Sequence, residues 1–174
     1  MAQVQQTASK GEIMVTPAKI SQIAVVVRDL EKAMKAYHQT LGWGPFNVYE
    51  HVPPALHDTH LRGVATKYSM LGAETSVQGM GFELIQPLDG PSIYKEWLEQ
   101  HGEGFHHLAV MKHTAEESEQ FKKDMAKQGM RVLMGGRIGE TIEFYYLDTA
   151  PVLKIIIESG SGHAIDLKPT RQYP

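Results

Sequence analysis

Residues 22–43, QIAVVVRDLEKAMKAYHQTLGW, decide the fold because their pattern returns in residues 107–130, HLAVMKHTAEESEQFKKDMAKQGM. Each stretch begins as an apolar strand, continues as an amphipathic helix and ends near a glycine. Asp29 is placed to cap the first helix, and Thr114 with Glu117 has the spacing of a capping box for the second. An internal repeat requires one structural unit that the chain uses twice.

Both units continue with three more predicted strands, and the last strand of each is apolar with one acid, in FELIQ at 82–86 and IIIES at 155–159. We therefore predict an α+β fold of two β-α-β-β-β modules that form one curved, barrel-like mixed sheet with helices outside. The predicted parts are a flexible N-terminal arm over residues 1–17, a first module over 18–90, a second module over 91–160 and an irregular C-terminal tail over 161–174.

The sequence between residues 53 and 100 predicts one loop, two strands and a short helix. PPALHDTHL at 53–61 is polar and proline-rich, which predicts a loop. GVATKYSML at 63–71 and GMGFELIQP at 79–87 predict strands, with a polar turn between them. SIYKEWLEQ at 92–100 predicts a short helix that joins the two modules.

The composition excludes several classes of function. The 174 residues are 42% hydrophobic and 21% charged with a net charge of −3, which is typical of a globular domain. No cluster of Lys and Arg offers a face for nucleic acid or an anionic membrane, and no apolar run approaches the length of a membrane span. The N-terminus lacks the pattern of a signal peptide, so we expect a cytoplasmic protein. Without cysteine, any chemistry has to come from His, carboxylates, Tyr, Lys or a metal with N and O ligands.

Strand alternation places four polar residues on one face of the predicted sheet. In the first strand, the aliphatic positions favour the helix side, so Gln22 faces the concave side. His107 takes the equivalent position in the second unit. Glu83 lies between Phe82 and an apolar neighbour and faces away from them, and Glu158 is its counterpart in the last strand.

Gln22, Glu83, His107 and Glu158 together form a set of N and O donors suited to one divalent metal ion such as Zn, Co, Ni, Mn or Fe. Each residue alone has a simpler explanation, since a single strand histidine is more often a hydrogen-bonded core residue than a ligand. The recurrence of both positions in a repeat favours the metal site. His106 has the opposite parity, which places it on the helix side or near the start of the strand, so we expect it to pack or hydrogen-bond.

At these residues the chain resembles the vicinal oxygen chelate superfamily, which holds glyoxalases, extradiol dioxygenases and methylmalonyl-CoA epimerases. The resemblance rests on IAVVVRDLEKAMKAYHQTLGWGPF, FELIQPLDGPSIYKEWLEQHGEGFHHLAV and YLDTAPVLKIIIE, and it is greatest to the epimerase branch. It implies paired modules around one metal site, a homodimer and ligands at the same four positions. It also implies removal and return of a proton next to a carbonyl or thioester through a metal-stabilised enolate.

The resemblance implies two carboxylate bases, and one of them corresponds to Glu158. The other position holds Thr66, which is a poor base, so Tyr68 on the same predicted face is our candidate for the second acid or base. A core tyrosine with a hydrogen-bonded hydroxyl explains Tyr68 equally well. The first ligand position, which is more often His in epimerases, holds Gln22 as in some glyoxalase I enzymes.

The sequence therefore predicts an epimerase or racemase whose partner is a small carbonyl substrate, either an acyl-CoA or an aromatic ketone such as an isoflavanone. A glyoxalase- or lyase-type enzyme is the alternative, because it uses the same enolate. A ligand-binding protein without catalysis is the alternative from another class, and the presence of the acid and histidine ligands argues against it. An extradiol dioxygenase fits least, since that chemistry favours two His and one carboxylate.

Overall fold

The computed structural model describes residues 18–162 and 167–174 of the chain. The predicted arm over residues 1–17 lies outside the described residues. One mixed sheet of 11 strands, which is not closed, runs through the molecule in the order β11-β2-β5-β6-β1-β7-β10-β9-β8-β3-β4. In the described part of the chain, no helix is long and apolar enough to cross a membrane.

The first module contributes β1 (Gln22–Val26), α1 (Leu30–Leu41), β2 (Phe46–His51), β3 (Leu56–Leu61), β4 (Val64–Ala65), β5 (Met70–Val77) and β6 (Met80–Pro87). Its helix begins where expected, since the side chain of Asp29 accepts a hydrogen bond from the backbone of Lys32. It ends at Gly42, which adopts the left-handed conformation at φ 69°. Helix α1 packs its buried Leu30 and Met34 onto the outer face of the sheet.

The second module contributes α2 (Ile93–His101), β7 (Gly104–Ala109), α3 (Ala115–Lys127), β8 (Val132–Ile138), β9 (Ile142–Leu147), α4 (Ala150–Leu153) and β10 (Ile156–Ser161), and β11 (Arg171–Tyr173) follows. Both hydrogen bonds of the predicted capping box between Thr114 and Glu117 are present. Helix α3 covers the outer face of its module through Met125, which packs against Tyr145 and Leu147.

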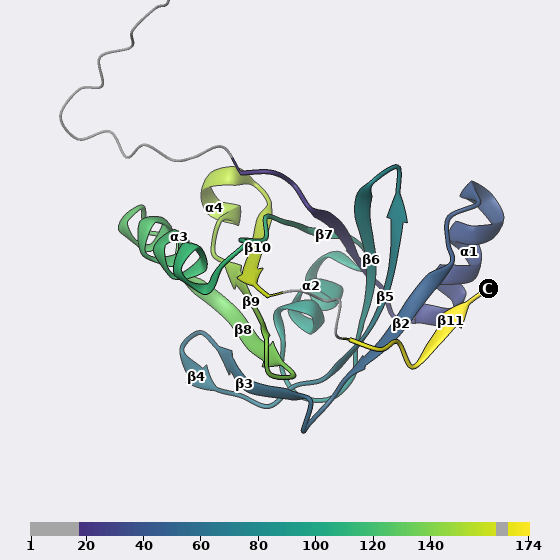
Figure 1. Cartoon of the computed structure of the whole chain (residues 1–174), viewed down its shortest axis with the longest axis horizontal. Coiled ribbons are helices and arrows are strands. Elements are labelled where there is room, and N and C mark those ends of the chain that lie inside the picture. The colour runs from purple at the N-terminus through teal and green to yellow at the C-terminus, as the bar shows by residue number, and fades with distance from the viewer. Residues whose placement is uncertain (1–17, 163–166) are drawn as a thin grey trace, which may run out of the picture.

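The two modules meet at the centre of the sheet, where β1 pairs antiparallel with β7. On either side the order is symmetrical, because β1 pairs parallel with β6 and β7 pairs parallel with β10. The predicted α+β fold of two modules in a curved mixed sheet is therefore confirmed, and Figure 1 shows α1 and α3 on opposite sides of the molecule.

The position of α2 differs from the prediction that all helices lie outside. Its buried Ile93, Tyr94 and Leu98 pack in the same core as Ala24 and Val26, which face the inner side of β1. Figure 1 places α2 between the two groups of strands. The helix that joins the modules thus fills part of the concave side and supplies side chains close to the candidate site.

Residues 53–61 do not form the predicted loop, because β3 pairs antiparallel with β8 and extends the sheet of the second module. A polar strand near the sheet margin needs only backbone partners, so it lacks the apolar pattern by which strands are recognised. A bulge between His57 and His60 weakens that pattern further.

The strand predicted over 63–71 is displaced along the chain. Strand β5 covers Met70–Val77, and the turn before β6 is reduced to Gln78 and Gly79, both with positive φ. Gly72 and Glu74 suggested a turn, but they alternate with apolar residues and face the concave side.

The tail over 161–174 is also more regular than expected. Ser161 still belongs to β10, and Arg171–Tyr173 forms β11, which pairs antiparallel with β2. Backbone pairing with an exposed strand edge again explains a strand that has no apolar periodicity.

Candidate metal centre

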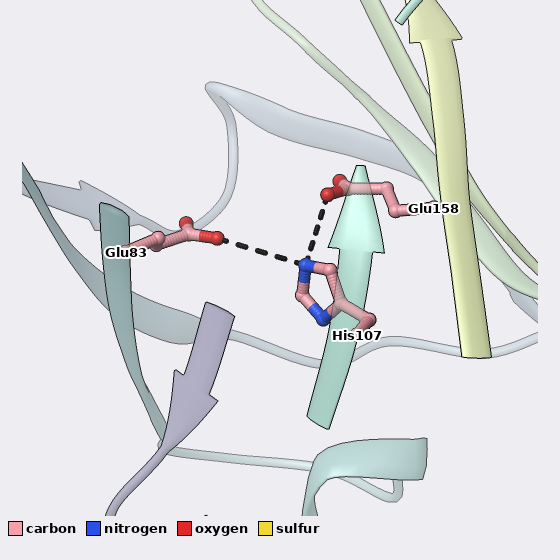
Figure 2. A group of neighbouring side chains, drawn as sticks. All are labelled: Glu83, His107 and Glu158. Carbon is pink, nitrogen blue, oxygen red and sulfur yellow. Dashed lines mark ion pairs between the residues drawn. The ribbon is translucent and has the colours of Figure 1, made fainter. Parts of the chain in front are cut away.

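Three of the four predicted ligands converge on the concave face of the sheet. Glu83 lies on β6, His107 on β7 and Glu158 on β10, and one donor atom of each lies within 4.8 Å of the other two. Nε2 of His107 is 3.0 Å from Oε2 of Glu158 and 3.9 Å from Oε2 of Glu83. Figure 2 shows the two carboxylates reaching toward this nitrogen from different directions, since their strands lie on either side of β1 and β7.

The strand register explains why residues so far apart in sequence meet. Ala24 on β1 pairs with Glu83 on one side and with His107 on the other. Ala109, two residues after His107, pairs with Glu158. The two modules therefore present an acid from the last strand beside an alanine from the first strand, as the repeat predicted.

Gln22 holds the position in the first module that His107 holds in the second, since each lies two residues before the alanine that pairs with the acid. Its backbone pairs with Gly81 and Ala109, and strand alternation puts its side chain on the face of Ala24. Its role as a fourth ligand stays a prediction.

The unsatisfied atoms of the site fit a divalent cation. His107 is fully buried and Glu83 and Glu158 are each 8% exposed. Nε2 of His107 and Oε2 of Glu158 have no hydrogen-bond partner in the described part of the chain, although they are 3.0 Å apart. Two ligand atoms at right angles, each about 2.1 Å from one ion, would be about 3 Å apart. The donor set and its spacing therefore suit a metal ion of the zinc type.

Glu158 is held by two tyrosines from the inner side of the molecule. The hydroxyl of Tyr146 donates to Oε1 of Glu158 over 3.2 Å, and the hydroxyls of Tyr94 and Tyr146 are 2.6 Å apart. Since the hydrogen of Tyr146 goes to Glu158, Tyr94 is the donor to Tyr146. Burial, and next the charge of Glu158, raises the pKa of Tyr146 well above its ordinary value, so Tyr146 stays a neutral donor. This bond leaves Oε2 of Glu158 directed toward His107.

His107 is held by its neighbour His106. The two Nδ1 atoms are 2.8 Å apart, and His106 is 1% exposed. Between these strands Ala24 pairs with His107 and Val25 with Phe105, so His106 is the extra residue of a β-bulge.

The predicted packing and hydrogen-bonding role of His106 fits these contacts, but its predicted direction is wrong. The bulge breaks the alternation, and the ring packs against Tyr94 and Trp97 of α2. Burial, and next the charge of His107, lowers the pKa of His106 well below its ordinary value, while the backbone of Ile93 opposes the shift.

The wall of the first module holds two titratable groups that sequence reasoning missed. Glu74 on β5 pairs with Glu83 on β6, and burial, then the charge of Glu158, raises the pKa of Glu74 to about 7. His51 on β2 is buried, which lowers its pKa to about 4 against the opposing effect of Glu158. A Cβ at Gly72 would lie 3.2 Å from Nε2 of His51 and 3.4 Å from Oε1 of Glu83, so Gly72 leaves room for both.

The alternation of FNVYEH contained the signal for His51. Phe46 and Val48 face the core under α1, so Asn47, Tyr49 and His51 have to face the other side.

Burial, then the charges of Glu74 and Glu158, raises the pKa of Glu83 well above its ordinary value. Such a concentration of buried carboxyl groups favours a bound cation.

Tyr68 and Thr66 lie in the connection between β4 and β5 rather than in a strand. The hydroxyl of Tyr68 donates to the carbonyl of Gly135 over 2.9 Å, and its side chain is buried among the residues of the inner core. Burial, then the charge of Glu158, raises its pKa above the ordinary value. The hydroxyl of Thr66 donates to the carbonyl of Val64. Tyr68 as an acid or base stays a prediction, and it would have to release its bond to Gly135.

Fold and site together define a protein of two fused β-α-β-β-β modules with a candidate N/O metal centre between them. Residues 21–146 match the model of the Glyoxalase/Bleomycin resistance protein/Dioxygenase superfamily. The chain belongs to this family, which is the vicinal oxygen chelate superfamily expected from the sequence. No curated protein matches the chain.

Several solved structures are similar in fold. A hypothetical protein from Bacillus halodurans has a TM-score of 0.62 at 17% identity, over 85% of this chain and 96% of that one. Methylmalonyl-CoA epimerase from Mycobacterium tuberculosis has a TM-score of 0.58 at 19% identity, over 86% and 93%. A variant of the Streptomyces coelicolor epimerase in complex with 2-nitronate-propionyl-CoA has a TM-score of 0.56 at 21% identity, over 86% and 100%. At such identities the likeness establishes the fold.

Proposed function

We propose that this protein is a metal-dependent epimerase or racemase, an isomerase that removes and returns the proton next to a carbonyl or thioester group. The substrate class is an acyl-CoA or an aromatic ketone such as an isoflavanone. The observation that carries the proposal is the buried convergence of Glu83, His107 and Glu158, with an unpartnered nitrogen and an unpartnered carboxylate oxygen 3.0 Å apart. Gln22 completes the proposed ligand set.

A divalent ion at this centre supplies positive charge for a substrate oxygen that becomes negative when the neighbouring carbon loses its proton. Glu158 is the proposed base. Its Oε1 accepts a hydrogen bond from the hydroxyl of Tyr146, so Oε2, which accepts none from the described residues, would have to leave its place as a ligand to take up the proton. The carboxylate thereby takes up the proton from carbon, and the carbanion's electrons move onto the carbonyl oxygen.

Inversion requires a second group that returns a proton to the other face of the same carbon. Tyr68 is the group that the sequence suggests for this role, and Glu74 is the one that the structure adds. Glu74 lies on the same face as Glu83, and a pKa of about 7 suits a group that has to give and take a proton near neutral pH.

The substrate proposal draws on the similar structures named above. Two of them are methylmalonyl-CoA epimerases, and one of these two is in complex with 2-nitronate-propionyl-CoA. The same removal of a proton would serve a glyoxalase- or lyase-type reaction, which stays the alternative for this site. A homodimer and a cytoplasmic location also stay predictions.

The test is proton exchange in D2O. Single enantiomers of α-substituted acyl-CoA thioesters and of isoflavanones are incubated with metal-loaded protein, and deuterium at the α carbon and optical rotation are followed. We expect deuterium uptake together with loss of rotation for one of these classes. The variant Glu158→Gln serves as the control and should lower the rate by at least about 100-fold. Absence of exchange with every substrate at full metal loading would contradict the proposal.

A further inference from the structure

We propose that His106 is a positioning residue that fixes the tautomer of His107. In this arrangement Nδ1–H of His107 donates to Nδ1 of His106, and the lone pair on Nε2 of His107 faces Glu83 and Glu158. The proposal rests on the metal centre of the proposed function, but it holds for any reaction at that centre.

The geometry requires the two rings to share one hydrogen. Their Nδ1 atoms are 2.8 Å apart, which is a hydrogen-bond distance between nitrogen atoms. One nitrogen must therefore carry hydrogen and the other must accept it. Both side chains are buried, so water is not available to satisfy either ring nitrogen in their place.

The surroundings of Nε2 decide which ring donates. If His106 donated, the hydrogen of neutral His107 would lie on Nε2, and the described residues offer that atom no hydrogen-bond acceptor in acceptable geometry. Oε2 of Glu158 is near, at 3.0 Å, but makes no hydrogen bond with it. If His107 donates, its one ring hydrogen is satisfied by His106, and Nε2 is the unprotonated atom that a metal ligand needs.

The fold holds His106 in place for this role. The residue is the extra member of the bulge in β7, which turns its ring toward α2 instead of α3. Its ring centre lies 5.3 Å from that of Tyr94 and 5.3 Å from that of Trp97. In this arrangement the hydrogen of neutral His106 lies on Nε2, which is the ring atom left for the backbone hydrogen bond with Ile93 that raises the pKa of this histidine.

The first experiment reads the tautomer directly in the metal-free protein. Histidine labelled with 15N is observed in long-range proton–nitrogen correlation spectra, and the signals are assigned with single-histidine variants. We expect His107 to be protonated at Nδ1 and unprotonated at Nε2 before any metal is added. A hydrogen on Nε2 of His107 in the folded protein would overturn the proposal.

The second experiment compares two variants of nearly equal size. His106→Asn keeps an oxygen acceptor near the place of Nδ1, whereas His106→Leu removes it. Zinc affinity, measured by competition with a chromophoric chelator, should fall about 10- to 100-fold in His106→Leu and stay within about threefold of the wild type in His106→Asn. His101→Leu is the control, because His101 stacks on the same Trp97 at 4.2 Å.

Two results of this comparison would contradict the proposal. Wild-type affinity in His106→Leu would show that the hydrogen bond is dispensable, and equal losses in both variants would show that only packing matters. If His106→Leu does not fold, the tautomer of the wild type and the affinity of His106→Asn still decide. Neither readout depends on turnover, so a failure of the proposed isomerase activity would leave both results unchanged.

Discussion

The two modules share one architecture but hold their proposed ligands differently. In the second module, Glu158 accepts a hydrogen bond from Tyr146, and His107 is bonded to His106. In the first module, the described residues give the side chain of Glu83 no hydrogen bond, and its acidic neighbour Glu74 raises its pKa further. Ligands fixed by partners keep their geometry without a metal, whereas a bound ion would have to order Glu83.

The difference arises from α2, the helix between the modules. Its Tyr94 lies against both supports, since its hydroxyl bonds to Tyr146 and its ring packs on His106. A duplicated unit thus becomes asymmetric when a single joining helix occupies one side of the concavity. We therefore expect the second module to contribute more than the first to the affinity for the metal.

The largest expected effect on metal affinity comes from replacing, one at a time, the two proposed ligands that hold equivalent positions in the two modules. His107→Ala should weaken zinc binding by more than about 100-fold, because it removes a fully buried nitrogen donor. Gln22→Ala should weaken it by about tenfold or less, since an amide is a weaker ligand than an imidazole. Isothermal titration of both variants measures the contrast, and equal losses would contradict the asymmetry.

A smaller effect is expected from the tyrosine that supports Glu158. Tyr146→Phe leaves the hydroxyl of Tyr94 and Oε1 of Glu158 without their shared partner, so it should lower stability by about 1–3 kcal/mol. It should also weaken metal binding by about tenfold. Tyr68→Phe is the matched control, because it too removes a buried hydroxyl but one that is bonded to Gly135. Metal affinity that changes equally in both variants would argue against a specific support of Glu158.

Glu74 on β5 of the first module should make the stability of the metal-free protein depend on pH. The pKa of Glu74 is about 7 in the folded protein, above its ordinary value of 4.5, so the folded state binds more protons than the unfolded state between these values. The free energy of unfolding should therefore decrease as the pH rises from about 4.5 to about 7. Urea unfolding across this range should show a flatter profile for Glu74→Gln. An unchanged pH profile in this variant would show that the pKa of Glu74 is not raised in the folded protein.

The smallest effect is expected at Gly72. A methyl group there would lie 3.2 Å from Nε2 of His51 and 3.4 Å from Oε1 of Glu83, so these two side-chain ends have to move by a few tenths of an ångström. Gly72→Ala should therefore alter metal affinity only a few-fold. Gly79→Ala, at a turn where the Cβ would meet nothing within 4 Å but φ is +83°, separates this local effect from general destabilisation.

The sequence predicted the repeat, the caps of α1 and α3 and the face shared by Glu83, His107 and Glu158, because each depends on a local period or on parity. It missed β3 and β11, since strands that join by backbone pairing at a sheet edge need no apolar pattern. It also misplaced the ring of His106, because a bulge shifts parity at one residue without any mark in composition.

The contacts of Tyr94 on α2 with Tyr146 and His106 could not be predicted from the sequence for a related reason. Tyr94 and Tyr146 are 52 residues apart, and their hydroxyls meet only when the joining helix enters the concave side. Periodicity identifies the buried face of a helix but not the layer against which that face packs.

Elemental mass spectrometry of untagged protein would show whether Glu83, His107 and Glu158 bind one divalent ion. After reconstitution with zinc and removal of free metal, we predict about one equivalent per chain in the wild type and almost none in His107→Ala. Wild-type protein that retains no metal after reconstitution would contradict this binding, as would a variant that retains as much as the wild type.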